Sequence, residues 1–228
     1  MNTTITNTTT NLNAKINTNT TGITTLKNEL KTKPGEITSS GGEIFNDYSE
    51  NIANSAYSHA EGHKSHAKNA VAHAEGYSTE ALGYSSHAEG YNTTVTNDGV
   101  KDNGDIEVVG GHAEGMRSEA SNRAAHAEGF WSIASGEASH AEGYRGDAIG
   151  AFSHAEGDET DAIGAAAHSE GYHTKAQGDY SHAEGKGTIA TGIAQHTAGR
   201  YNLQDNNKLV IIGNGSSNTS RSNAYTLD

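Results

Sequence analysis

The chain has 228 residues, a formal net charge of −13 and no cysteine. Val, Ile, Leu and Phe make up only about 13% of it, below the roughly 20% under which a charged chain is usually disordered. The acidic balance excludes nucleic acid and anionic membranes as partners, the lack of cysteine excludes disulfides and thiolate metal sites, and no apolar run approaches the ~20 residues of a membrane span.

The first 33 residues carry a heptad pattern, and they open on Met, Asn and Thr rather than on a Sec-type signal. The pattern predicts an α-helical coiled-coil stalk. A disordered polar leader is the alternative, because Thr and Asn are poor helix formers and Gly22 interrupts the segment. Pro34 ends the helix, and residues 34–57 form a neck. The residues expected at the helix interface are Ile5, Leu12, Ile16, Asn19, Ile23, Leu26 and Leu30.

Residues 58–202 are an internal repeat built on the word HAEG. Its successive histidines are 14 residues apart, with one interval of 25, and a second Ala and a second Gly follow the first pair by seven residues. Two Gly in every 14 positions are incompatible with a helix. The repeat instead predicts a parallel β-solenoid in which each 14-residue coil has two short strands joined by turns, with Ala as its core residue and a rise of ~4.8 Å per coil.

His and Glu of the first strand share one face, opposite to the buried Ala, and they hardly vary among the copies. We therefore expect these two columns to pair with one another at an interface between chains, with the pKa of each paired His raised. A ladder of metal ions held by the histidines is the alternative; the prediction is no metal and no cofactor. The interface residues expected are His59, Glu61, His73, Glu75, His87, Glu89, His112, Glu114, His126, Glu128, His140, Glu142, His154, Glu156, His168, Glu170, His182 and Glu184.

The one long interval contains an insertion, at residues 92–111. Two β-prone runs, Thr93–Thr96 and Ile106–Val109, flank a cluster of turn formers, so we expect the insertion to replace the second strand with a protruding hairpin. Such loops are either ornamental or carry binding. The candidate binding residues, including exposed aromatic residues one coil further on, are Tyr91, Thr94, Asp98, Lys101, Asp102, Asn103, Asp105, Phe130 and Trp131.

Residues 203–228 leave the repeat, and the apolar run Leu209–Ile212 predicts a more conventional strand. The sequence does not indicate an enzyme. The zinc deaminase motif needs cysteines that the chain lacks, and the metalloprotease motif HExxH is absent. A constellation repeated nine times is also unlike a catalytic site.

The run ASHAEGYRGDAIGAFSHAEG, from Ala138 to Gly157, resembles the head repeat of the trimeric autotransporter adhesins (YadA-like), in the HAEG variant of phage tail fibre and appendage proteins. The resemblance covers about two thirds of the chain. It implies a left-handed parallel β-roll that forms a homotrimer through the first strand, although the adhesin heads carry Val and Ile where this chain has His and Glu. Asn19 is similar to the core asparagines of trimeric adhesin stalks, and residues 208–228 resemble the segment that precedes a self-cleaving chaperone (peptidase G2-like) domain.

The resemblance implies a trimeric tail fibre or receptor-binding protein of a phage or phage-tail-like particle. Such a protein attaches to a saccharide or protein on the bacterial host surface and assembles with other tail or baseplate proteins in the virion. A bacterial trimeric surface adhesin is the alternative.

Overall fold

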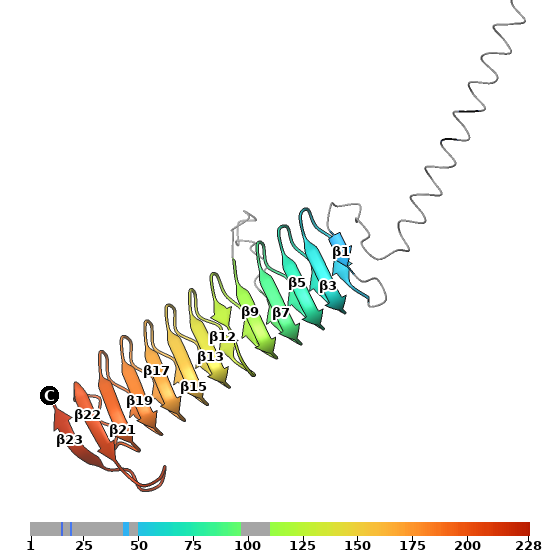
Figure 1. Cartoon of the computed structure of the whole chain (residues 1–228). Coiled ribbons are helices and arrows are strands. Elements are labelled where there is room, and N and C mark those ends of the chain that lie inside the picture. The colour runs from blue at the N-terminus through green and yellow to red at the C-terminus, as the bar shows by residue number, and fades with distance from the viewer. Residues whose placement is uncertain (1–14, 16–18, 20–42, 46–49, 97–109) are drawn as a thin grey trace, which may run out of the picture.

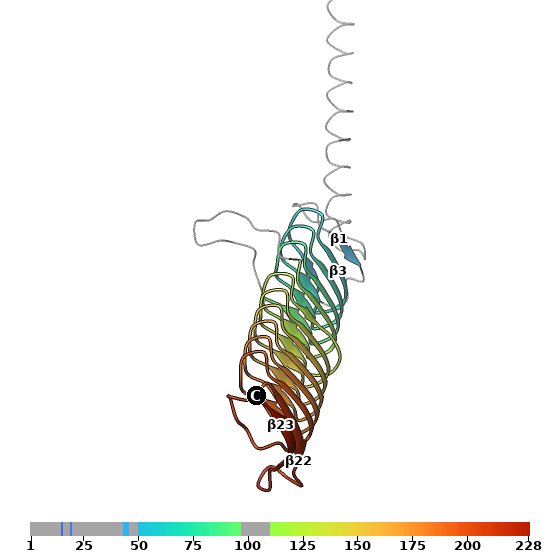
Figure 2. The ribbon, with the colours of Figure 1, turned by 90° about the vertical axis from the view of Figure 1, so that its left-hand side faces the viewer.

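The computed structural model of the chain describes residues 50–96 and 110–228, the backbone of residues 43–45, and the single residues Lys15 and Asn19. The described residues form an elongated stack of coils that runs from β1 to β23 (Figure 1). The predicted coiled-coil stalk falls almost wholly outside the described residues. The stacking of the coils is also visible in the view turned by 90° (Figure 2).

The first strand of each standard coil begins at the repeated His and joins one sheet, in which β1 to β21 and then β22 pair in parallel. Only β23 pairs antiparallel, with β22. The strands of this 13-stranded sheet are β1 (Glu43–Phe45), β3 (His59–His63), β5 (His73–Tyr77), β7 (His87–Tyr91), β9 (His112–Met116), β11 (His126–Ala127), β13 (His140–Tyr144), β15 (His154–Asp158), β17 (His168–Tyr172), β19 (His182–Lys186), β21 (His196–Arg200), β22 (Val210–Asn214) and β23 (Asn223–Leu227).

The second strand of each coil has two residues and joins a parallel sheet of ten strands on the opposite side of the core. The two-strand coil and its 14-residue spacing confirm the solenoid that the repeat predicts. The strands of this second sheet are β2 (Ile52–Ala53), β4 (His66–Ala67), β6 (Glu80–Ala81), β8 (Thr94–Val95), β10 (Glu119–Ala120), β12 (Ile133–Ala134), β14 (Asp147–Ala148), β16 (Asp161–Ala162), β18 (Lys175–Ala176) and β20 (Ile189–Ala190).

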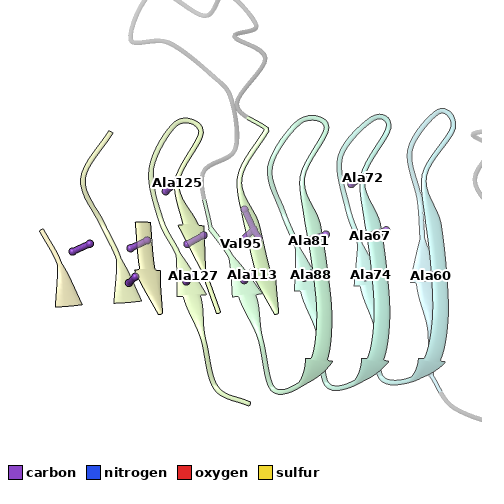
Figure 3. Close-up of a cluster of buried hydrophobic side chains, with 14 of the residues drawn as sticks. Ala60, Ala67, Ala72, Ala74, Ala81, Ala88, Val95, Ala113, Ala125 and Ala127 are labelled. Atoms are coloured by element: carbon purple, nitrogen blue, oxygen red, sulfur yellow. The ribbon is translucent and has the colours of Figure 1, made fainter. Parts of the chain in front are cut away.

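The core between the sheets is made of alanine (Figure 3). Ala60 of β3 and Ala67 of β4 are fully buried, and the same two positions are filled by buried small residues in nearly every coil. Two further positions of each coil also point inward, and in most coils they carry Ser, Thr or Ala, as at Ser132 and Ser139. Most coils therefore bury four small side chains, where only alanine was expected inside. Some of the inward hydroxyls donate hydrogen bonds to backbone, as Ser132 Oγ does to the carbonyl of Gly143 at 3.3 Å, whereas others, such as Thr160 Oγ1, have no partner among the described residues.

The chain reverses at two left-handed positions in each standard coil. One follows the first strand, as at Arg117, Trp131 and Arg145, with φ of 59°, 59° and 54°; the other precedes the next first strand, as at Ala138. The backbone N–H of each such residue bonds the coil before it: Trp131 donates to the carbonyl of Met116 at 2.9 Å. These bonds offset the unfavourable left-handed conformation, which costs roughly 1 to 2 kcal/mol per residue.

Larger side chains close the C-terminal end of the stack. Asn202 occupies the inward Thr position and pairs with both backbone groups of Ile189, accepting from its N–H at 2.8 Å and donating to its carbonyl at 3.0 Å. Gln195 fills the other inward position and donates to the carbonyls of Asp205 and Lys208. Ile211 of β22 is a fully buried branched residue where other coils have Ala. The predicted conventional strand at Leu209–Ile212 is confirmed as β22.

Two expected boundaries are wrong. The solenoid begins before residue 58, because β1 pairs with β3 and β2 pairs with β4, so part of the expected neck belongs to the stack. The insertion is also shorter than 92–111. Thr94–Val95 is the second strand of its coil, paired with β6 and β10, and it is not a hairpin arm. Residues 97–109, which include Ile106–Val109, lie outside the described residues.

Val95 occupies the core position that carries Ala in nine other coils. Its larger volume is accommodated by a glycine, which has no side chain, at another inward position of the same coil. A Cβ added to Gly111, an inward position that carries Ser or Ala in most other coils, would lie 2.8 Å from Val95 Cγ1. The extra volume of Val95 therefore occupies the space that Gly111 leaves.

A double-mutant cycle tests this compensation. We expect Gly111→Ala to destabilise the chain by about 1 to 3 kcal/mol through overpacking, and Val95→Ala by about 1 kcal/mol through the space it leaves. The double variant recreates a standard coil and should be more stable than the sum of the two changes predicts. Urea unfolding of the four proteins measures the coupling, and strictly additive changes would contradict the compensation.

Candidate functional site

The ten repeat histidines, His59 to His196, form one column along the first sheet. Parallel strands in register place the same residue above itself at the strand spacing. From His73 onward neighbouring rings are stacked, with centroids 4.7 to 4.9 Å apart and interplanar angles of 10° or less. His59 meets His73 edge-on at 83°. The column therefore presents a row of half-buried imidazoles on the outer face of the sheet.

The glutamates lie two residues further along each strand, beside a glycine that has no side chain. Together these positions form a groove of about 630 Å³ along the stack, with one wall of carboxylates. The residues lining it are Glu142, Gly143, Glu156, Gly157, Glu170, Gly171, Glu184 and Gly185.

Histidine and glutamate approach each other within one chain. In the earlier coils His Nε2 faces the Glu of its own strand, as in His87 and Glu89 at 3.5 Å. In later coils it faces the Glu of the preceding coil: the Nε2 to Oε1 distances are 3.3 Å for His154 and Glu142 and 3.2 Å for His182 and Glu170. The expected pairing of the two columns thus exists inside the chain, and pairing across subunits stays a prediction.

The expected rise in the histidine pKa is wrong for the five histidines that show a shift, because burial and stacking outweigh the carboxylates. Burial is the largest cause and lowers the pKa of each, and the neighbouring imidazoles lower it further. The nearby glutamates raise it by less. The five are His73, His87, His112, His126 and His168.

Several of these imidazoles also have an unsatisfied nitrogen. Nε2 of His112, His126, His140 and His168 is buried and has no hydrogen-bond partner, although part of each ring is exposed. A buried polar atom without a partner is uncommon in a folded protein and calls for an explanation.

A second feature lies around Trp131, in the turn after the first strand. The guanidinium groups of Arg117 and Arg145 lie 4.9 and 5.0 Å from the Trp131 ring centre, one coil before it and one coil after it. Arg145 also donates to Glu159 at 3.0 Å. Next to them is a groove of about 470 Å³, hereafter the Trp131 groove. Its lining residues are Asn92, Thr94, Arg117, Ser118, Glu119, Trp131, Ile133, Arg145 and Asp147.

The structure brings some of the predicted binding residues together and separates others. Thr94 and Trp131 line the Trp131 groove. Phe130 packs edge-on against Trp131 and stacks on Tyr144 at 5.3 Å. Phe130 and Trp131 are half-buried, where exposure was expected, and Phe130 lies two strands from Tyr91, which stacks on Tyr77. The predicted residues outside the described part are Asp98, Lys101, Asp102, Asn103 and Asp105.

Arg117 and Arg145 were not among the residues predicted from the sequence, although the repeat contains the signal for them. Both stand 14 residues from Trp131, so the repeat places all three in one column. Reading the variable turn position by position along the repeat identifies the cluster.

A scan against protein-family models found no match, and a search of curated proteins found none either. Among the described residues, none belongs to a helix with the length and apolar character needed to span a bilayer.

The lowered histidine pKa values predict that acid destabilises the fold. The unfolded histidines bind protons below their pKa of 6.5, whereas the folded column resists protonation, so its contribution to stability is full above pH 6.5 and is lost as the pH falls through the lower folded values. The charges facing each ring are the imidazoles above and below it and the glutamates of its own and adjacent coils. We expect the melting temperature, measured in EDTA, to fall between pH 7.5 and 5.

His112→Gln with His126→Gln should flatten this pH dependence, because two shifted groups are removed. His63→Gln, outside the column, should leave it unchanged. A melting temperature that rises toward pH 5 would instead show that the histidines are ion-paired with raised pKa values.

Proposed function

We propose that the chain is the head of a homotrimeric attachment fibre, carried on the tail of a phage or phage-tail-like particle, that binds a saccharide or protein on a bacterial surface. The observation that carries the proposal is the stack itself: uniform coils form a rod whose outer columns repeat without change. A rod with a constant face suits side-by-side association, and its variable positions suit recognition. The resemblance of the HAEG repeats to adhesin and tail fibre heads supports the same function.

The face proposed for trimerisation is the one that carries the histidine and glutamate columns. It has the same two residues in nearly every coil, and an open groove runs along four of its coils, from Glu142 to Gly185. Because a threefold assembly brings equivalent positions of three chains to one axis, a column of identical residues gives the same contact at each level.

The proposed receptor contact is the Trp131 groove together with the insertion at residues 97–109. The groove combines an indole and two guanidinium groups with the carboxylates of Glu119 and Asp147, so its lining is balanced in charge on a chain of net charge −13. The insertion follows β8, and Thr94 of β8 lines this groove. Aromatic and arginine side chains are enriched at binding hot spots.

The absence of cysteine permits a direct test of the trimer. Light scattering of the full chain should give a mass near 3 × 23.8 kDa, about 71 kDa. Glu156→Cys on the proposed axis should oxidise to a covalent pair of chains, whereas Gln177→Cys, exposed near the second sheet, should not. A mass near 24 kDa would refute the trimer, and equal cross-linking of the two variants would refute this face.

Attachment is tested with two matched substitutions at left-handed turns. Trp131→Asn introduces the residue that the chain itself places in this column at Asn92, and Phe152→Asn is the control at the other turn, where Phe152 is exposed. Binding of the fluorescent trimer to a panel of intact bacteria should fall at least tenfold for Trp131→Asn and stay unchanged for the control. Replacing residues 97–109 with a short Gly-Ser link should weaken binding and leave the mass unaltered. Full attachment by both variants would exclude the groove and the insertion.

A further inference from the structure

We propose that the histidine and glutamate columns bind divalent transition-metal ions, each held by Nε2 of two successive histidines and a carboxylate oxygen of the glutamate between them. Three such triads occur among the described residues, with the three ligand atoms of each within 4.8 Å of one another. They are His126, Glu128 and His140; His154, Glu156 and His168; and His168, Glu170 and His182.

The first triad is the best prepared for an ion. Nε2 of His126 and of His140 is buried and has no hydrogen-bond partner, and Glu128 Oε2 lies 3.7 Å from His126 Nε2, too far for a hydrogen bond. An ion between these atoms would satisfy both nitrogens together. Stacking holds the two rings parallel, at an interplanar angle of 6°, so both nitrogens are on the same outer face of the strand.

The ligand set selects the class of metal. Two imidazoles and one carboxylate suit Zn²⁺, Co²⁺, Ni²⁺ or Fe²⁺, whereas Mg²⁺ and Ca²⁺ prefer sites made only of oxygen. Ligand atoms on one tetrahedral zinc ion are about 3.4 Å apart, given zinc to nitrogen bonds of about 2.1 Å. Rotation of half-exposed side chains therefore has to close the triad by roughly 1 Å. The ion also offsets the repulsion among neighbouring carboxylates of the groove.

The stoichiometry follows from the shared residue. His168 belongs to two triads, and its single Nε2 serves one ion at a time. The first triad and one of the other two can therefore be filled together, which gives two ions per chain. All three protein ligands come from one chain, so the site does not depend on the proposed trimer.

The test uses the full chain, purified without a histidine tag, stripped with EDTA and titrated with Zn²⁺ under equilibrium dialysis. We expect two ions per chain. His126→Gln with His140→Gln should leave one, whereas His63→Gln with His173→Gln, which removes as many histidines outside the triads, should leave two. Glu128→Gln keeps the imidazole stack and should weaken one site at least tenfold. Co²⁺ should give visible absorption bands that the first double variant reduces by half.

Failure to bind Zn²⁺ at 1 mM would overturn the proposal, and so would equal losses in the two double variants. One ion per three chains, lost when the trimer is dissociated, would place the metal between chains and overturn the site within one chain. Because the light-scattering mass is read separately, a monomer that still binds two ions keeps this inference and refutes the trimer.

Discussion

The stacking of identical coils at the spacing of hydrogen-bonded strands is the constraint on which the structure depends. Every residue of a standard coil lies less than 5 Å from the equivalent residue 14 positions later. A side chain is therefore tolerated only where it fits against the equivalent side chains of the neighbouring coils. Alanine fits inside, because four inward positions share the narrow space between the sheets. Glycine is required beside the glutamates: a Cβ on Gly157, at a φ of +115°, would lie 2.3 Å from the carbonyl oxygen of Gly171. The chain therefore folds with few large apolar residues, because backbone hydrogen bonds between successive coils take the place of a large hydrophobic core.

The same stacking has energetic costs, and residues at the end of the stack offset some of them. Placing each imidazole on another disfavours protonation and leaves several nitrogens without partners. A stack also ends in unpaired backbone groups, and Asn202 supplies them with the hydrogen bonds that a further coil would have made. Ile211 then provides the larger buried side chain that the last parallel strand needs, because it no longer has to match a copy of itself.

Much of this fold could be predicted from the sequence, because a repeat turns single residues into columns. The 14-residue spacing and the recurring glycines predicted coils of two short strands with alanine inside. Three features could not be reached in this way. The pKa direction of the histidines depends on the balance between burial and carboxylate distance, which spacing does not reveal. The position of the insertion depends on Val95 being accepted in the core, which requires knowing that Gly111 lies against it. The inward Ser and Thr positions were missed because a polar side chain is expected outside, whereas some of these hydroxyls donate to the backbone of the next coil.

Under the proposed function, specific recognition has to come from the coils that depart from the repeat. The described part of the chain has its clearest departures close together: Val95 in the alanine column, the start of the insertion after β8, and the Arg117, Trp131 and Arg145 cluster in the turns of the coils that follow. Thr94 lines the same groove as Trp131, so the strand that leads into the insertion also borders the cluster. The strands on both sides of the insertion keep their register with the neighbouring coils, so this coil carries additional residues without disturbing either sheet. The place where the repeat is least regular is therefore also where a binding surface can arise at the smallest cost in stability.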